Sequence, residues 1–101
     1  MTTFDKIREW GIDKGLTGKN GKATIAGQMQ KLDEEHDELV LAVADKNRKE
    51  MKDAIGDMIV VLTLLADLLG MSVENCIDSA YDVISKRNGT MQNGVFVKDT
   101  Q

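Results

Sequence analysis

The chain has 101 residues, of which 42% are hydrophobic and 30% charged, a composition typical of one soluble globular domain. The 13 Lys and Arg against 17 Asp and Glu give a net charge of −4. This balance argues against a nucleic-acid duplex as the main partner, because phosphate binding needs a concentrated basic surface. One Cys excludes an intrachain disulfide, and the sequence shows neither a membrane-length apolar run nor an apolar signal core. We therefore expect a single domain over residues 1–101, located in the cytoplasm without membrane contact.

The first predicted element is a helix over about residues 3–14, in which Phe4, Ile7 and Trp10 recur at helical spacing after a Thr that can cap it. A stretch rich in Gly and Lys follows over 15–22. Its residues do not fit the spacing of a nucleotide-binding P-loop. We interpret it as a loop within the domain that lies near the functional site.

Two long helices are predicted next, over about residues 23–45 and 48–69. The first has an apolar seam with steps of four and three residues, the spacing used in helical bundles: Ile25, Met29, Leu32, His36, Leu39 and Val43. The position of His36 in this seam favours a core or interface residue over a metal ligand. The second is apolar nearly all round from Ile59 to Leu65, which predicts the central buried helix of the fold.

A fourth helix is expected to begin after Ser72 as N-cap and to end before Gly89, with Cys76 buried and inert. The tail over residues 90–101 predicts an extended arm, with a hairpin turn at Asn93-Gly94. The chain is thus predicted to be all-α, an antiparallel bundle of about four helices with a short C-terminal arm. A domain of this size buries only about two-thirds of its unfolded surface, so we expect oligomerisation to complete the bundle.

Acidic residues gather on the two long helices. Glu35 and Glu38 lie about 60° apart around their helix, beside Lys31 and to one side of the apolar seam. On the next helix Glu50, Asp53 and Asp57 share one face, which continues with the apolar residues Val61, Leu64 and Leu68. A solvated charge stripe would stay polar, whereas this acidic patch runs into apolar surface.

Carboxylates that converge between two antiparallel helices repel one another and lose hydration. A divalent cation offsets both costs, and ligands that are all oxygen favour Mg²⁺ or Mn²⁺ over zinc. Lys31, Lys86 and Arg87 could then supply positive charge to a polyphosphate. The alternative is that these acids form the ordinary solvated face of a helical adaptor, and composition and spacing alone favour that alternative.

A resemblance to a known protein family favours the metal site over the solvated face. The segment Lys31–Leu39, followed by Asp53–Met58, resembles the EExxE and ExxD helices of the MazG-like all-α nucleoside triphosphate pyrophosphohydrolases. The similarity continues in Trp10-Gly11 and in the stretch Arg87–Lys98, which is similar to the short phage-type members. One departure is Ala54, which stands where the second motif has Glu.

The resemblance implies a Mg²⁺-dependent hydrolase, with Mn²⁺ as a possible substitute, that cleaves (deoxy)nucleoside triphosphates between the α and β phosphates to a monophosphate and pyrophosphate. It implies that Glu35, Glu38 and Asp57 bind the metal, with Asp53 as the substitute for the missing Glu. Glu34 is either a ligand or the base that orients the attacking water.

For the substrate, the resemblance implies that Lys31 contacts phosphate and that Lys86 and Arg87 close over it from the end of the fourth helix. Trp10 either stacks on the base or fills the bundle. Relatives form homodimers or homotetramers, which is the assembly expected here. Ala54 keeps an alternative open, a weak or inactive homologue that binds nucleotides or a partner helix.

Overall fold

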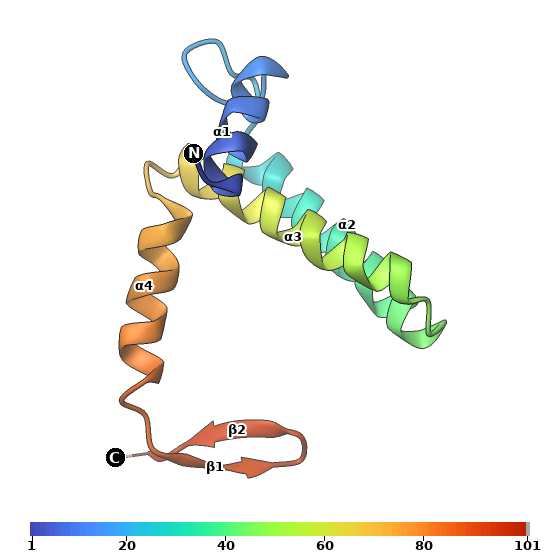
Figure 1. Ribbon diagram of the computed structural model, residues 1–101, viewed down its shortest axis with the longest axis vertical. Helices are drawn as coiled ribbons and strands as arrows, with labels where there is room; N and C mark the ends of the chain where they lie inside the picture. Colours follow the sequence, from blue (N-terminus) through green and yellow to red (C-terminus); the bar gives the residue numbers. More distant parts are fainter. Residues whose placement is uncertain (101) are drawn as a thin grey trace.

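The computed structural model describes residues 1–100 and contains four helices and one small sheet (Figure 1). The elements are α1 (Thr3–Asp13), α2 (Ile25–Ala44), α3 (Arg48–Leu68), α4 (Val73–Ile84), β1 (Gly89–Gln92) and β2 (Val95–Lys98). The predicted all-α class is confirmed, with four helices and a C-terminal arm that forms an antiparallel two-stranded sheet.

Each helix begins after a residue whose side chain accepts a hydrogen bond from the first turn. Thr2, Thr24, Asn47 and Ser72 are these N-caps. At Thr2 the cap is reciprocal, because the Asp5 carboxylate accepts a hydrogen bond from the Thr2 backbone amide at 2.9 Å. The helix starts are therefore encoded locally, by residues whose oxygens satisfy amides that the helix leaves free.

The antiparallel pair α2 and α3 forms the body of the molecule, joined by a short turn in which Lys46 adopts a φ of 55° (Figure 1). The core lies along α3. Its buried apolar residues are Ala42 from α2 and Ala54, Val61, Leu64, Leu65 and Ala66 from α3.

Helix α1 approaches α3 very closely at Gly11. A Cβ atom at Gly11 would lie 2.6 Å from Cδ2 of Leu64, which is fully buried. Only glycine permits this approach without movement of the core. The contact fixes the position of α1, and therefore of Trp10, over the α2–α3 pair.

Helix α4 points away from the body, at a bend of 104° to α3. Gly70, at a φ of +73°, ends α3, and the Met71 amide donates to the Ala66 carbonyl at 2.8 Å, which completes a Schellman motif. Arg8 of α1 adds a clamp, since its guanidinium donates to both carboxylate oxygens of Glu74 at 2.7 and 2.6 Å. The corner between α3 and α4 is thus held by both backbone and side chains.

Among the described residues, no single helix has the length and apolar character to cross a membrane, and α3 and α4 pass that test only when counted together across their bend.

The C-terminal hairpin follows the prediction. Asn93 and Gly94 have φ values of 51° and 84°, and they connect strands in which Gln92 pairs with Val95 and Gly89 with Lys98. This is the two-residue turn that the Asn-Gly pair predicts, because both positions need positive φ.

Three expectations about burial are wrong for the single chain. In the predicted seam, Ile25, Met29 and Val43 are about half exposed or more, and His36 is exposed as well. Helix α3 contacts the neighbouring strip of α2, which contains Glu35 and Ala42. On α3 itself Ile59 and Leu62 are exposed, so one side of the predicted central helix is uncovered. Cys76 is likewise exposed, since α4 has no buried residue in the described chain.

The clamp generates a prediction about pH. Arg8 lowers the pKa of Asp5 from 3.8 to about 2 and also lowers that of Glu74, both chiefly through its hydrogen bonds to these carboxylates. A depressed carboxylate pKa stabilises the fold above the unfolded-state value and loses that contribution as pH falls through the folded-state value. Arg8→Met is therefore expected to lower Tm at pH 5 to 7, and the difference from the wild type should shrink between pH 4 and 2. Thermal melts followed by circular dichroism test this, and a difference that stays constant with pH would contradict it.

Candidate functional site

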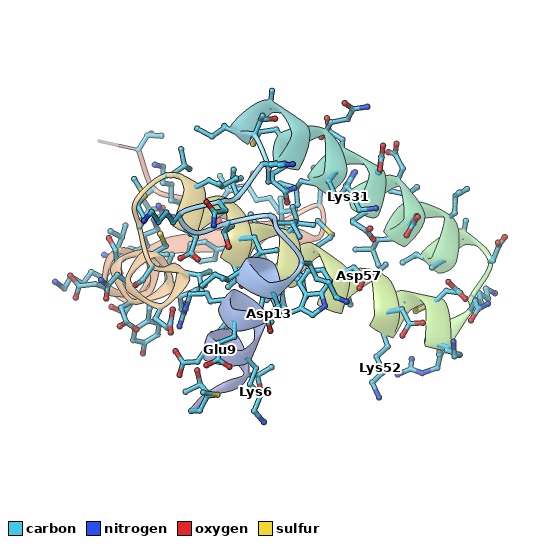
Figure 2. The ribbon with its side chains drawn as sticks, turned by 90° about the horizontal axis from the view of Figure 1, so that it is seen from above. Lys6, Glu9, Asp13, Lys31, Lys52 and Asp57 are labelled. Atoms are coloured by element: carbon cyan, nitrogen blue, oxygen red, sulfur yellow. The ribbon has the colours of Figure 1, made fainter. Side chains whose placement is uncertain are left out.

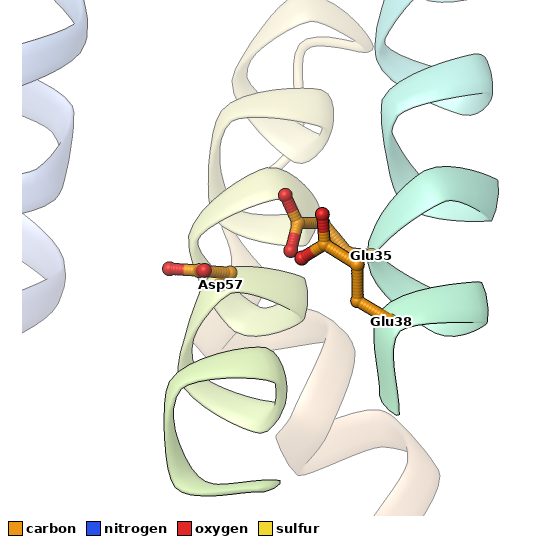
Figure 3. Close-up of side chains that lie close together, drawn as sticks. All are labelled: Glu35, Glu38 and Asp57. Carbon is orange, nitrogen blue, oxygen red and sulfur yellow. The ribbon is translucent and has the colours of Figure 1, made fainter. Parts of the chain in front are cut away.

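Three carboxylates converge between the middle of α2 and α3. One oxygen each from Glu35, Glu38 and Asp57 lies within 4.8 Å of the others. Figure 3 shows Glu35 and Glu38 extending from α2 toward the helix that carries Asp57. The spacing of three residues places both glutamates on one side of α2, as the sequence predicted. The structure therefore brings together three of the four predicted metal ligands.

Burial is unequal in this cluster. The side chains of Glu38 and Asp57 are exposed, whereas Glu35 is only 4% exposed. Lys31 lies one turn earlier on α2 and forms an ion pair with Glu35, with Nζ 3.2 Å from Oε1. The other oxygen, Oε2, is buried and has no hydrogen-bond partner in the part of the chain that the structure describes.

The electrostatics of the cluster follow from this crowding. The pKa of Glu38 is raised, chiefly because the Glu35 carboxylate lies beside it. The pKa of Asp57 is also raised, first by loss of hydration and then by the charges of Glu35 and Asp53. The pKa of Lys31 is raised in turn because it faces Glu35. The folded chain thus holds more negative charge here than its single cation neutralises.

These residues fit a divalent cation. The donor set is all oxygen, which is the preference of Mg²⁺ and Mn²⁺. The buried and unpartnered Oε2 of Glu35 provides an acceptor that nothing else in the described chain uses. An acidic residue kept buried in that state is unusual, because an unpaired buried oxygen costs free energy unless a partner arrives.

A hollow of about 640 Å³ adjoins the carboxylates, and Lys31, Glu35 and Asp57 are among the residues that line it. Its apolar lining is formed by Trp10, Leu16, Val60, Val61 and Leu64. In Figure 2 Lys31 of α2 and Asp57 of α3 lie on neighbouring helices at this side of the molecule. The hollow thus has both charged and apolar walls, and it unites Trp10, Lys31, Glu35 and Asp57 from the predicted site.

Other predicted residues lie outside this arrangement. Glu34 is about half exposed, its Oε2 lies 3.7 Å from Lys31 Nζ, and it does not belong to the group of converging carboxylates. Asp53 forms an ion pair with Lys49 at 3.3 Å and does not belong to the group of converging carboxylates, although its charge reaches Asp57. Ala54, at the motif position of Glu, is buried in the contact between α2 and α3.

Lys86 and Arg87 are not brought to the carboxylates within one chain. They line a separate hollow with Asn88, Lys98 and Asp99, beyond the end of α4 and away from the α2–α3 pair (Figure 1). Lys86 instead lies 3.5 Å from Asp82.

The hollow also contains residues that sequence reasoning missed. Gln28 lines it one turn before Lys31, and Lys22 and Thr24 line it from the loop that precedes α2. Gln28 could have been predicted from the sequence, because it lies three residues before Lys31 and therefore on the same side of the helix. Lys22 belongs to the stretch 15–22 that was interpreted as a loop near the site, whereas Thr24 lies in the stretch predicted as helix.

Comparison with known families gives a match over most of the chain. The model of the family described as phosphoribosyl-ATP pyrophosphohydrolase matches residues 19–83, a span that contains α2, α3 and the three converging carboxylates. That family lies within the MazG-like all-α superfamily, so the resemblance is confirmed at this level. No curated protein and no solved structure gives a significant match.

The cluster generates a prediction about stability. Without metal, Glu38→Gln and Asp57→Asn should leave Tm unchanged or raise it, because each removes charge repulsion from the cluster. Millimolar Mg²⁺ should raise the Tm of the wild type, since a ligand at 100 times its Kd stabilises the fold by about 2.7 kcal/mol, and it should raise that of the two variants much less. Asp33→Asn, on the exposed side of α2, is the matched control and should respond as the wild type does. A clear loss of metal-free stability in Asp57→Asn would mark a structural acid instead.

Proposed function

The chain belongs to the phosphoribosyl-ATP pyrophosphohydrolase family, whose activity is pyrophosphohydrolysis of nucleotide substrates, and we propose that it cleaves (deoxy)nucleoside triphosphates between the α and β phosphates. The products are a nucleoside monophosphate and pyrophosphate. The observation that supports this proposal best is the convergence of Glu35, Glu38 and Asp57 beside a hollow that Glu35 and Asp57 line together with apolar residues. A nucleotide combines the same two kinds of group, charged phosphates and a flat base.

The carboxylates of Glu35, Glu38 and Asp57 would hold Mg²⁺ or Mn²⁺ in this proposal. A bound divalent cation neutralises phosphate oxygens and helps water to attack. The oxygen of that water forms a bond to the α phosphorus, the bond from this phosphorus to the α–β bridging oxygen breaks, and pyrophosphate leaves with that oxygen. The water gives up its protons to base and solvent.

Residues of α2 have distinct roles in this reaction. Glu34, one turn before Glu38, is the candidate to accept a proton from the water, because the three converging carboxylates would hold the metal. Lys31 points its ammonium group at the site and is suited to bind phosphate.

The apolar lining of the hollow would receive the nucleoside. Trp10 is about half exposed and lines the hollow with Val60 and Leu64, so its ring is free to stack on a base. Gln28 carries an amide that can both donate and accept hydrogen bonds. Phosphoribosyl-ATP, named in the family description, is a second candidate substrate.

A weak or inactive homologue that binds nucleotides is the alternative. Its support is specific, because Ala54 replaces a motif Glu and Asp53 does not join the three carboxylates. The proposal further takes residues 1–101 as a single domain in the cytoplasm that acts as a homodimer or homotetramer.

Removal of a carboxylate from the cluster tests the proposed reaction. Glu38→Gln and Asp57→Asn should each lower kcat/KM at least about 100-fold, because loss of outer-shell partners of metal ligands alone costs 10- to 100-fold. Pyrophosphate release with Mg²⁺ should be measured on the four dNTPs, ATP and phosphoribosyl-ATP. Asp33→Asn should keep wild-type activity. If the wild type cleaves none of these substrates yet binds them, the alternative of an inactive nucleotide-binding homologue holds.

Trp10 provides a second test, on substrate binding. Trp10→Leu keeps an apolar side chain but removes the stacking surface, which is worth about 1–3 kcal/mol per base. We expect KM to rise roughly 10-fold with a smaller change in kcat, measured on the best substrate of the panel. Ile12→Leu, at an exposed position outside the hollow, is the control. An unchanged KM in Trp10→Leu would show that the indole only fills the fold.

A further inference from the structure

The hollow beside the carboxylates extends along the α2–α3 pair, because the residues that line it follow one side of each helix. On α2 the lining runs from Thr24 to Glu35, a distance of about 16 Å at a rise of 1.5 Å per residue. On α3 it runs from Asp57 to Leu64. Since the helices are antiparallel and Asp57 meets Glu35, Leu64 lies toward Thr24. The hollow therefore leads from the carboxylates toward the start of α2.

Lys22 lines this hollow at the start of α2. It is the last residue of the loop 15–22 and, with Lys31, one of the two lysines among the described residues that line the hollow. Lys31 is paired with Glu35 at 3.2 Å, whereas Lys22 has no ion pair within the described chain. The ammonium group of Lys22 is therefore available to a ligand in the hollow.

The backbone of the loop holds Lys22 in this place. The Lys22 amide donates to the Gly15 carbonyl at 2.9 Å, and the Ala23 amide donates to the Leu16 carbonyl at 3.0 Å. Gly21 packs directly on the other side of the loop, since a Cβ atom there would lie 2.6 Å from the Leu16 carbonyl oxygen. The loop is thus closed at its neck, and the Lys22 side chain starts from a fixed point beside the hollow.

The order of the groups in a nucleotide decides which of them meets Lys22. In the proposed reaction the α phosphate lies at the carboxylates, and Lys31, one turn from Glu35, is suited to phosphate. A nucleoside that follows the hollow from there places its sugar first and its base last. The edge of the base therefore lies toward the start of α2, where Lys22 and the half-buried Gln28 line the hollow.

Lysine selects among bases by its chemistry, because an ammonium group donates hydrogen bonds and cannot accept them. Guanine presents the acceptors O6 and N7 on one edge, and thymine and uracil present the acceptor O4. Adenine and cytosine carry an amino group at these positions, which is a donor and cannot pair with an ammonium group. The amide of Gln28 both donates and accepts, so it adapts to either kind of base. Lys22 is therefore the group that discriminates.

From these observations we propose that Lys22 is a specificity-determining residue, which donates a hydrogen bond to a keto oxygen of the base. It selects nucleotides of guanine, uracil and thymine over those of adenine and cytosine. The inference rests on the proposed function, since it takes the nucleoside to occupy the hollow with the α phosphate at the carboxylates. It adds to that function the class of base.

Binding of analogues that cannot be hydrolysed tests the inference apart from catalysis. Inosine and adenosine triphosphates with a methylene group between the α and β phosphorus atoms are the sharpest pair, because hypoxanthine has a keto oxygen where adenine has an amino group. Titration calorimetry with Mg²⁺ should show that the wild type binds the inosine analogue at least about 10-fold more tightly, as one hydrogen bond from a charged donor gives. Lys22→Met keeps an apolar stem without the donor and should bind both analogues about equally.

Lys19→Met is the matched control, because Lys19 lies in the same loop, has the same charge and does not line the hollow. It should keep the wild-type ratio of the two Kd values. Equal binding of both analogues by the wild type would overturn the inference and leave the proposed function standing. So would a Lys22→Met variant that weakens both analogues by the same factor, which would make Lys22 a phosphate ligand. A wild type that binds neither analogue would overturn the proposed function as well.

Discussion

The contact between α2 and α3 is the constraint on which the site depends, because it buries the Glu35 carboxylate. One oxygen of Glu35 faces Lys31 at 3.2 Å, and the other is buried without a partner in the described chain. Glu38 from the same helix and Asp57 from the facing helix add two further negative charges within 4.8 Å. The packing that builds the core therefore also creates a local excess of negative charge, which a divalent cation would relieve.

The surroundings turn this charge cluster into a site that is suited to a nucleotide. Gly11 lets α1 approach Leu64, and this approach places Trp10 at the edge of the hollow beside the carboxylates. The loop before α2 closes another side through Leu16 and Lys22. A solvated acidic stripe on a helical adaptor would have neither the buried Glu35 nor the apolar hollow. The family match over residues 19–83 agrees with this distinction, because it covers both acidic helices.

Much of the fold follows from local sequence signals. Thr2, Ser72 and the Asn93-Gly94 turn act through hydrogen bonds and dihedral preferences within a few residues, so the elements they start or join were predictable. The meeting of Glu35, Glu38 and Asp57 also follows from helical spacing once α2 and α3 are antiparallel neighbours. Spacing gives the angle between residues on one helix, however, and not which side meets a neighbour. The seam of Ile25, Met29 and Val43 was therefore assigned to the core although the chain leaves it exposed.

The positions of longer-range features depend on several segments at once. The direction of α4 is set by Gly70, by Ser72 and by the ion pair between Arg8 and Glu74. The two residues of this ion pair are 66 positions apart in the sequence. No periodic pattern shows that combination, so Lys86 and Arg87 were expected at the carboxylates and lie beyond the end of α4 instead. The exposed apolar seam of α2 and the exposed apolar side chains of α4 and the hairpin share one property. Both are apolar surfaces that a single copy of the chain leaves uncovered.

The central claim is that the three carboxylates form a site for a divalent cation. Crystals grown with Mn²⁺ and measured near the manganese absorption edge test it most directly. The account predicts an anomalous difference peak between α2 and α3, within bonding distance of oxygens from Glu35, Glu38 and Asp57. Carboxylates that point apart into solvent at saturating Mn²⁺, with no peak between them, would contradict it.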